Sequence, residues 1–230
     1  AFDENTRRYS VMSARDTRKD QSYALWGLSQ EALSRTIFPL GDLTKPEVRR
    51  IAGRYGLKTA SKEESFEICF VADNDYRRFL KDRVPDLDSS IPEGDIVRNG
   101  RVVGKHKGFP YYTIGQRSGI GSHGERAYVT AIDAQSNTIE IGRMNDLFHT
   151  GLIARDMNLI GIPELSDGMI VQAKIRYKDE PSVGTVFPID RGSFRLLFDE
   201  PKRAITPGQS VVMYDGEKLI GGGVIENVIM

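Results

Sequence analysis

Residues 94–106 read Gly-Asp-Ile-Val-Arg-Asn-Gly-Arg-Val-Val-Gly-Lys-His, and this stretch decides how the rest of the chain is interpreted. Two strand-like runs flank Asn99-Gly100, a dipeptide that forms two-residue hairpin turns because both of its positions accept a positive φ. The stretch therefore predicts a β-hairpin, with strands over Asp95–Arg98 and Arg101–Gly104.

On the carboxyl side of this hairpin, the chain continues as short strands separated by turns. Tyr128–Ile132 and Thr138–Ile141 flank the polar turn Asp133–Asn137. From Gly151 onward, roughly five or six further strands are predicted, with Gly, Pro and Asp between them. Short strands at this spacing predict a compact antiparallel barrel.

On the amino side, the pattern is helical. Arg8–Ala14 is predicted to be a strand, and Ser22–Arg35 is predicted to form two short helices, the second capped by Ser29. A further helix is predicted over about Asp75–Arg83, where it stops before Pro85.

The clearest helix signal on this side is Thr44-Lys45-Pro46-Glu47, a capping box in which the Glu47 carboxylate can reach back to Thr44. Apolar side chains follow at the spacing of one helix face, at Val48, Ile51, Ala52 and Tyr55. We therefore expect a helix with one buried face that ends at Gly56.

The order of these elements predicts a multi-domain α+β protein. Residues 1–87 contain too few strands for a complete α/β domain, so we expect them to be the helical tail of a larger one. Polar connectors at Asp86–Ser90 and Gly142–Phe148 then predict a small central β-rich domain over 88–148 and a C-terminal antiparallel β-barrel domain over 149–230.

Composition limits the partners. The 230 residues include 32 Lys+Arg and 32 Asp+Glu, a balance that disfavours non-specific coating of nucleic acid but leaves a local RNA site open. We expect no membrane association, because no apolar run approaches the roughly 20 residues of a spanning helix and no signal-peptide pattern opens the chain. The single cysteine, Cys69, favours a reducing compartment such as the cytoplasm.

Cys69 has two interpretations on the residues alone. A lone cysteine between Ile68 and Phe70 is often a small buried hydrophobe. A catalytic or sulfur-carrying role would need an exposed, stabilised thiolate. The nearby carboxylates of Glu63, Glu64 and Glu67 disfavour a thiolate, whereas Lys62 favours one, so the local sequence does not show activation.

Other candidate sites are weaker. His106, His123 and His149 lie in different predicted elements, and no Cys/His pair has metal-ligand spacing, so we expect no metal site. Gly115–Gly121 lacks the ending of a nucleotide-binding loop, which favours a structural loop. Gly221–Gly223 favours a bulge or a close chain contact.

Two segments toward the carboxyl end have residue types that suit RNA. Arg176-Tyr177 ends a predicted strand, where the arginine could pair with phosphate and the pair could stack on an unpaired base. Gln209 in the turn Thr206–Gln209 could bond a base or sugar. On the residues alone, a strand end without any ligand is the better interpretation of Arg176-Tyr177, and turn chemistry explains Thr206–Gln209 equally well.

A series of short strings, taken in chain order, resembles the MnmA family of tRNA-specific 2-thiouridylases. The strings are Lys19–Tyr23, Phe38–Gly41, Lys45–Arg49, Ile68–Phe70, Gly115–Arg117, Phe198–Pro201 and Thr206–Gln209. The chain departs from the commoner family form before the cysteine, with Phe66-Glu67 in place of Thr-Gly. The family's ATP-pyrophosphatase loop and its first catalytic cysteine do not occur in this sequence, so we expect a C-terminal portion of such an enzyme.

The resemblance implies a fold and a reaction. It implies an α/β adenine-nucleotide-hydrolase-like domain, of which residues 1–87 would be the helical tail. In the family reaction, ATP adenylates the C2 oxygen of the wobble uridine, a cysteine persulfide supplies sulfur, and AMP leaves. Cys69 matches the persulfide-bearing cysteine, and the absent first cysteine would then form a disulfide with it.

The resemblance also implies the partners. Lys19, Asp20 and Gln21, Arg176-Tyr177 and Gln209 match tRNA-contacting positions. The expected partners are tRNAs for Lys, Glu and Gln, ATP bound mostly outside this chain, and a persulfide donor such as a sulfurtransferase relay or a cysteine desulfurase. The chain alone is expected to be inactive. The alternative is a non-enzymatic RNA-binding, translation-factor-like β-barrel module.

Overall fold

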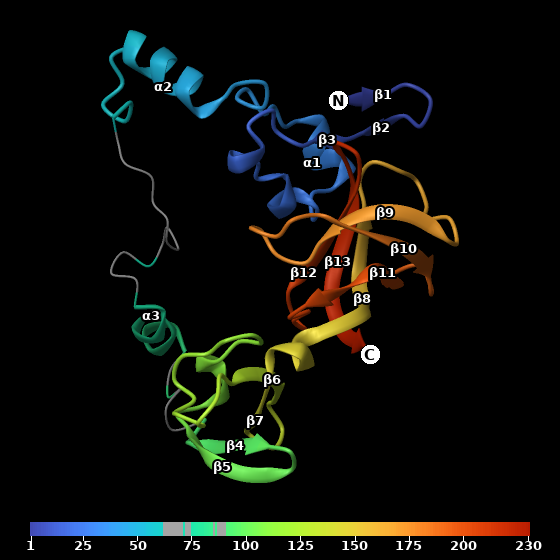
Figure 1. Cartoon of the computed structure of the whole chain (residues 1–230). Helices are drawn as coiled ribbons and strands as arrows, with labels where there is room; N and C mark the ends of the chain where they lie inside the picture. Colours follow the sequence, from blue (N-terminus) through green and yellow to red (C-terminus); the bar gives the residue numbers. More distant parts are fainter. Residues whose placement is uncertain (62–70, 72–74, 85, 87–90) are drawn as a thin grey trace. The chain divides into compact units, whose positions relative to one another are not determined.

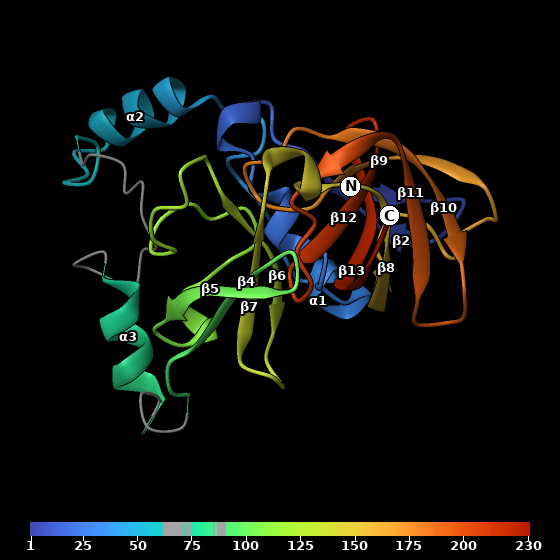
Figure 2. The same cartoon turned by 60° about the horizontal axis from the view of Figure 1, so that its bottom comes forward.

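The computed structural model describes residues 1–61, 71, 75–84, 86 and 91–230, and the chain divides into two compact units. The first unit, which we call the barrel unit, joins Ala1–Ser61 to His149–Met230. The second, the central unit, spans Lys62–Phe148. Figures 1 and 2 show the helices and strands of both units.

A closed antiparallel barrel forms the body of the barrel unit. Its strands follow the order β12-β9-β10-β11-β8-β13, and β12 pairs with β13 to close the ring. They are β8 (Phe148–Leu159), β9 (Met169–Lys174), β10 (Ser182–Pro188), β11 (Phe194–Arg203), β12 (Ser210–Asp215) and β13 (Lys218–Ile229). The barrel predicted from the strand spacing is therefore confirmed.

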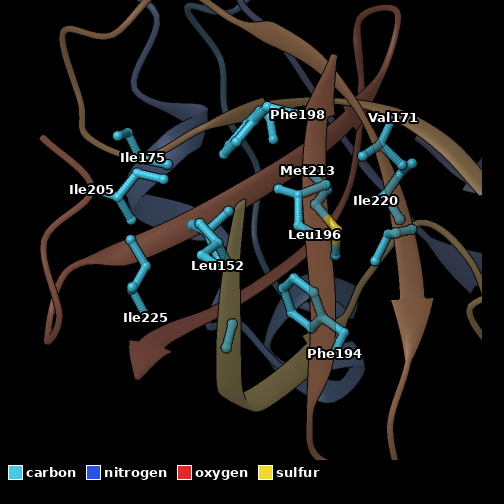
Figure 3. Packing of buried hydrophobic residues seen from close by; sticks show 14 of the residues in the cluster. Leu152, Val171, Ile175, Phe194, Leu196, Phe198, Ile205, Met213, Ile220 and Ile225 are labelled. Carbon is cyan, nitrogen blue, oxygen red and sulfur yellow. The ribbon is translucent and has the colours of Figure 1, made fainter. Parts of the chain in front are cut away.

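The barrel interior is apolar because alternate residues of every strand point inward. Phe194, Leu196, Met213 and Leu152 are fully buried there, and Figure 3 shows their side chains packed together. Burying one such side chain stabilises the fold by about 1.5–3 kcal/mol relative to leaving it in water. This core holds the loops of the barrel in fixed positions.

The amino-terminal segment packs on the outside of the barrel. It contains β1 (Phe2–Asp3), β2 (Arg8–Tyr9), β3 (Val11–Met12), the 3₁₀ turns η1 (Thr17–Lys19) and η2 (Ser22–Leu25), α1 (Gln30–Ser34) and α2 (Lys45–Arg54). Strand β3 pairs with the start of β13. Val11 and Leu33 share a buried cluster with Val212 and Leu219 of the barrel strands.

The helix caps predicted in this segment are present. The Ser29 hydroxyl accepts from the Ala32 amide 3.1 Å away and caps α1, as predicted. The Glu47 carboxylate accepts from the Thr44 amide at 2.7 Å and forms the reaching-back half of the predicted capping box of α2. The predicted first helix of Ser22–Arg35 is the short 3₁₀ turn η2 instead.

The expected burial of one α2 face is wrong for the described residues. No residue of α2 is fully buried, and Tyr55, which follows the helix, is 78% exposed. Ile37 and Leu40, in the preceding loop, are exposed as well. The spacing gave the correct helix and an amphipathic face, but spacing does not say whether this chain covers that face.

A four-stranded sheet of order β5-β4-β7-β6 forms the central unit. Its elements are α3 (Tyr76–Arg83), β4 (Gly94–Arg98), β5 (Arg101–His106), η3 (Phe109–Tyr111), β6 (Tyr128–Asp133), β7 (Thr138–Gly142) and η4 (Met144–Leu147). The predicted hairpin is β4–β5, with Asn99 and Gly100 at φ of 50° and 72°. The predicted β6–β7 hairpin is confirmed as well.

The predicted domain ranges 1–87, 88–148 and 149–230 stay a prediction. Residues 87 and 88 lie outside the described part of the chain. The contacts group residues 1–61 with the barrel, because the two segments share one buried cluster.

Candidate nucleic-acid interface

The predicted RNA-contacting residues all belong to the barrel unit, although they come from three separate segments. Lys19 is the last residue of η1, and Asp20 and Gln21 follow it. Arg176 and Tyr177 follow the end of β9, and Gln209 precedes β12.

Asp20 has a positioning role in the first segment. Its carboxylate accepts from the Ala14 amide at 2.9 Å, the Ser22 amide at 3.2 Å and the Ser22 hydroxyl at 2.7 Å. These bonds fold the chain around the carboxylate, so Asp20 shapes the loop that presents Lys19 and Gln21. Both neighbours are exposed.

Tyr23 links the three segments. Its hydroxyl donates to the Ser210 carbonyl at 2.8 Å, directly beside Gln209. Its ring lies edge-on to the Tyr177 ring, with centroids 6.5 Å apart. The predicted residues 19–21, 176–177 and 209 are therefore brought to one region by Tyr23, a residue that was not itself predicted as part of the site. Its place at the end of the string Lys19–Tyr23 was the available signal.

Trp26 strengthens the same connection. Its indole N–H donates to the Ser210 hydroxyl at 3.0 Å, and its carbonyl accepts from Asn158 of β8. A Cβ at Gly222 would lie 3.0 Å from the Trp26 ring, so glycine allows this close approach. The close chain contact predicted for Gly221–Gly223 is confirmed here.

Arg176 is held by the protein and still meets solvent. Its guanidinium donates to the Arg203 carbonyl at 2.8 Å, and its Nε lies 3.9 Å from the Asp179 carboxylate. Asp179 also pairs with Lys202 at 3.0 Å. The Arg176 side chain is 41% exposed, so one carbonyl and one carboxylate orient the cation without burying it.

Tyr177 and Gln209 differ in exposure. Tyr177 is 42% exposed and can offer a ring face to an unpaired base. Gln209 is half-buried, and its backbone N–H donates to the Thr206 carbonyl at 3.2 Å, which closes the predicted turn. Gly208 has a φ of 86° in that turn, a conformation that glycine adopts without strain.

Two phenols beneath this surface stay protonated at neutral pH. Burial is the main cause that raises the pKa of Tyr23 to about 12 and that of Tyr214 to about 12. The Tyr23 hydroxyl therefore remains a hydrogen-bond donor to Ser210. The Tyr214 and Ser22 hydroxyls lie 3.2 Å apart and share a hydrogen bond.

Cys69, the predicted sulfur carrier, lies outside the described residues, as do the neighbouring Phe66 and Glu67. Among the residues that the structure describes, no group of three or more His, Cys, Asp or Glu side chains could hold a metal ion. His106 is structural: it is buried, and its Nδ1 accepts from the Gly108 amide at 3.0 Å.

The described residues 1–61 do not fit the phosphates of ATP. Within the described residues 1–61, no glycine-rich turn opens a helix in the way that a phosphate-binding loop requires. The amino terminus of α2 already receives the carboxylates of Glu47 and Asp16, the latter at 3.0 Å from the Lys45 amide. We therefore derive no step through ATP from this part of the chain. The helices that the structure describes include none with the length and apolarity to cross a membrane.

Family models match three consecutive parts of the chain. Residues 2–73 match a tRNA methyl transferase HUP domain, residues 77–143 a tRNA methyl transferase PRC-barrel domain, and residues 149–225 an aminomethyltransferase beta-barrel domain. Together with the structure, these matches confirm the predicted multi-domain α+β class with a C-terminal antiparallel barrel.

Relatives match nearly the whole chain. The tRNA-specific 2-thiouridylase MnmA of Salinibacter ruber is 48% identical over 230 residues, which cover 99% of this chain and 60% of the relative. The protein of the same name from Moorella thermoacetica is 48% identical over 229 residues, covering 99% and 63%. That of Chlorobium luteolum is 48% identical over 228 residues, covering 96% and 62%. The chain thus spans about three fifths of the length of these relatives, and it belongs to the family of MnmA-type tRNA 2-thiouridylases.

Proposed function

We propose that this chain is the part of a tRNA 2-thiouridylase that binds tRNA and carries the transferred sulfur. The observation that supports this most strongly is the identity of 48% to relatives named tRNA-specific 2-thiouridylase over 99% of the chain. Fold alone would be a weaker argument, because one fold serves many functions.

In this proposal, the surface around Tyr23 binds the tRNA. Lys19 and Arg176 supply positive charge for phosphate, and Tyr177 offers a ring for an unpaired base. Gln209 adds a side-chain amide that can donate and accept. Asp20 acts indirectly, because its carboxylate oxygens accept hydrogen bonds from the loop itself.

Cys69 is proposed as the sulfur carrier. A persulfide donor protein, either a sulfurtransferase relay or a cysteine desulfurase, would load one sulfur on its thiol. The wobble uridine C2 oxygen, activated by ATP as an adenylate elsewhere in the whole protein, would leave with AMP as the C2–S bond forms. A second cysteine, absent from this sequence, would then attack the Cys69 sulfur, and the S–S bond to the transferred sulfur would break as a disulfide forms.

The lone cysteine gives a clean test of the sulfur step. Because the chain has a single cysteine, any persulfide on it must be at Cys69. We expect intact-mass spectrometry to show one added sulfur after incubation with a cysteine desulfurase, its substrate cysteine and a sulfurtransferase. Cys69→Ser should show none. A wild-type chain that stays unloaded while binding tRNA normally would favour the alternative, a non-enzymatic RNA-binding barrel module.

Product formation tests the reaction as a whole. We expect no 2-thiouridine from the 230-residue chain with ATP, persulfide donor and tRNA for Lys, Glu or Gln, because the family's ATP-pyrophosphatase loop is not in its sequence. Nucleoside mass spectrometry of the digested tRNA measures this. Robust thiolation by this chain alone would contradict that expectation.

A further inference from the structure

The central unit contains a second concentration of positive charge, separate from the residues discussed above. Helix α3 reads Tyr-Arg-Arg-Phe-Leu-Lys-Asp-Arg over residues 76–83, with four cations and one carboxylate in a chain of zero net charge. Such a local excess attracts polyanions even when the whole protein is neutral.

Contacts with the central unit fix the orientation of α3. The Tyr76 hydroxyl donates to the Tyr111 carbonyl at 3.0 Å, and Leu80 packs against the buried cluster of the sheet. Asp75 caps the helix by accepting from the Arg78 amide at 3.0 Å. The apolar side of α3 is therefore attached to the unit, while Arg78, Lys81 and Arg83 are exposed.

Arg77 is the most constrained of these cations. Its guanidinium carbon lies 5.5 Å from the centre of the Tyr111 ring and 6.0 Å from that of Tyr76. The hydrogen bond with Tyr76 raises the pKa of Arg77 above its ordinary value, and a guanidinium is charged at neutral pH even without such a shift. A guanidinium stacked on an aromatic ring keeps N–H donors in its plane, which suits the paired oxygens of a phosphate.

These side chains surround a hollow of about 600 Å³, which we call the α3 hollow. Its cations are Arg77, Arg78, Lys81 and Lys107, and Arg78 also forms an ion pair with Asp82 of the same helix. The carboxylates of Asp75 and Glu93 also line it, but Asp75 already serves as the helix cap. Lys107 follows β5, so the charge of the hollow comes from two elements far apart in sequence.

We propose that the α3 hollow binds phosphates of the tRNA backbone, as a second contact contributed by the central unit. This inference rests on the proposed function, which supplies a polyanionic substrate. Four cations against two carboxylates, with an arginine held on tyrosine rings, match a phosphate-bearing chain better than an apolar or cationic partner. The contact is independent of base sequence, because it reads only the backbone.

The test compares charge-matched variants of the 230-residue chain. Binding of fluorescently labelled tRNA is measured by anisotropy over a range of salt concentrations. The variant Lys81→Gln/Lys107→Gln removes two cations of the hollow. The control Lys58→Gln/Arg101→Gln removes two exposed cations that do not line it.

We expect the hollow variant to lose at least about tenfold in tRNA affinity near 0.1 M salt. Its salt slope, meaning the steepness with which the logarithm of tRNA affinity falls with the logarithm of salt concentration, should decrease by about 1.5. The control should stay within about twofold of the unmodified chain. Arg77→Lys, which keeps the charge but loses the planar fork, should lower affinity with an unchanged slope. Equal thermal unfolding of all variants would show that the loss is not a folding defect.

The outcomes separate this inference from the proposed function. If the unmodified chain binds tRNA and accepts persulfide but the hollow variant binds like the control, the α3 hollow inference is wrong and the proposed function stands. If the unmodified chain does not bind tRNA, both are wrong. If tRNA affinity is unchanged while binding of a poly-glutamate peptide is lost, the surface serves an acidic protein instead.

Discussion

Arg176 is a cation that the protein holds in place without neutralising it fully. The Arg203 carbonyl accepts a hydrogen bond from the guanidinium. Asp179 forms ion pairs with both Arg176 and Lys202, so its negative charge neutralises Arg176 only in part. A side chain oriented in this way loses little further freedom when it binds a phosphate. This is the basis for the first prediction at the scale of single residues.

We expect Arg176→Ala to weaken tRNA binding and to lower the salt slope by about one unit, the effect of losing one phosphate contact. Anisotropy titrations at several salt concentrations measure both quantities. Arg195→Ala is a matched control, because Arg195 is an exposed arginine of the same barrel that lies over the Phe187 ring. Weaker binding with an unchanged slope would assign Arg176 to base stacking, and unchanged binding would remove it from the site.

His106 gives a prediction about pH. Its Nδ1 accepts from Gly108 and its Nε2 faces the Asn137 carbonyl at 3.0 Å, an arrangement that requires the neutral ring with a proton on Nε2. Burial lowers the pKa of His106, although Asp95 and Glu93 oppose that shift. The unfolded chain therefore binds more protons, and this part of the stability is lost as pH falls below about 6.5.

We expect His106→Leu to cost about 1–3 kcal/mol at pH 7.5, because two buried polar groups lose their partner. Its unfolding free energy should also change less between pH 7.5 and 5.5 than that of the unmodified chain. Denaturant unfolding at each pH measures this. Val129→Ala, a buried substitution without a titratable group, should keep the full pH dependence. An equally steep dependence in His106→Leu would assign the titration to another group, such as His149.

At the scale of elements, the sequence predicted the helix caps and the hairpin turn, which depend on residues close together in the chain. The Ser29 cap, the Glu47 capping contact and the Asn99-Gly100 turn each depend on residues within a few positions. The bond from Tyr23 to Ser210 spans 187 positions and exists only because the barrel strands adopt one register. Sequence spacing carries no information about such a contact. Only the structure could therefore show that the predicted RNA-binding residues lie in one region of the barrel unit.

Helix α2 shows the same limit for burial. Its spacing predicts an apolar face, but Tyr55 at the end of that face is 78% exposed in the described chain. We expect Tyr55→Ser to change the free energy of unfolding by less than about 0.5 kcal/mol. Leu33→Ala, in the cluster between α1 and the barrel, should cost about 2–5 kcal/mol. Urea denaturation of both variants measures the difference, and a large cost for Tyr55→Ser would show that the face is covered.

At the scale of the whole molecule, the buried core inside the barrel and the buried core of the central unit share none of the described residues. The barrel core centres on Phe194 and Leu196, and the core of the central unit centres on Ile139 and Ile141. The strands around the two cores belong to separate sheets. Two such cores can open with different free energies, since stability need not be uniform across a chain.

This separation predicts how one core substitution affects the chain. Phe194→Ala should destabilise the barrel unit by about 3–5 kcal/mol, because it leaves a large cavity in a fully buried site. Native-state hydrogen exchange should then show weaker protection of β8–β13 and of the packed segment around Val11, with the protection of β4–β7 unchanged. Ile139→Ala should give the reciprocal pattern. Loss of protection in all strands from either substitution would mean that the chain opens as a single cooperative unit, and tRNA binding by the two units could then not be separated by mutation.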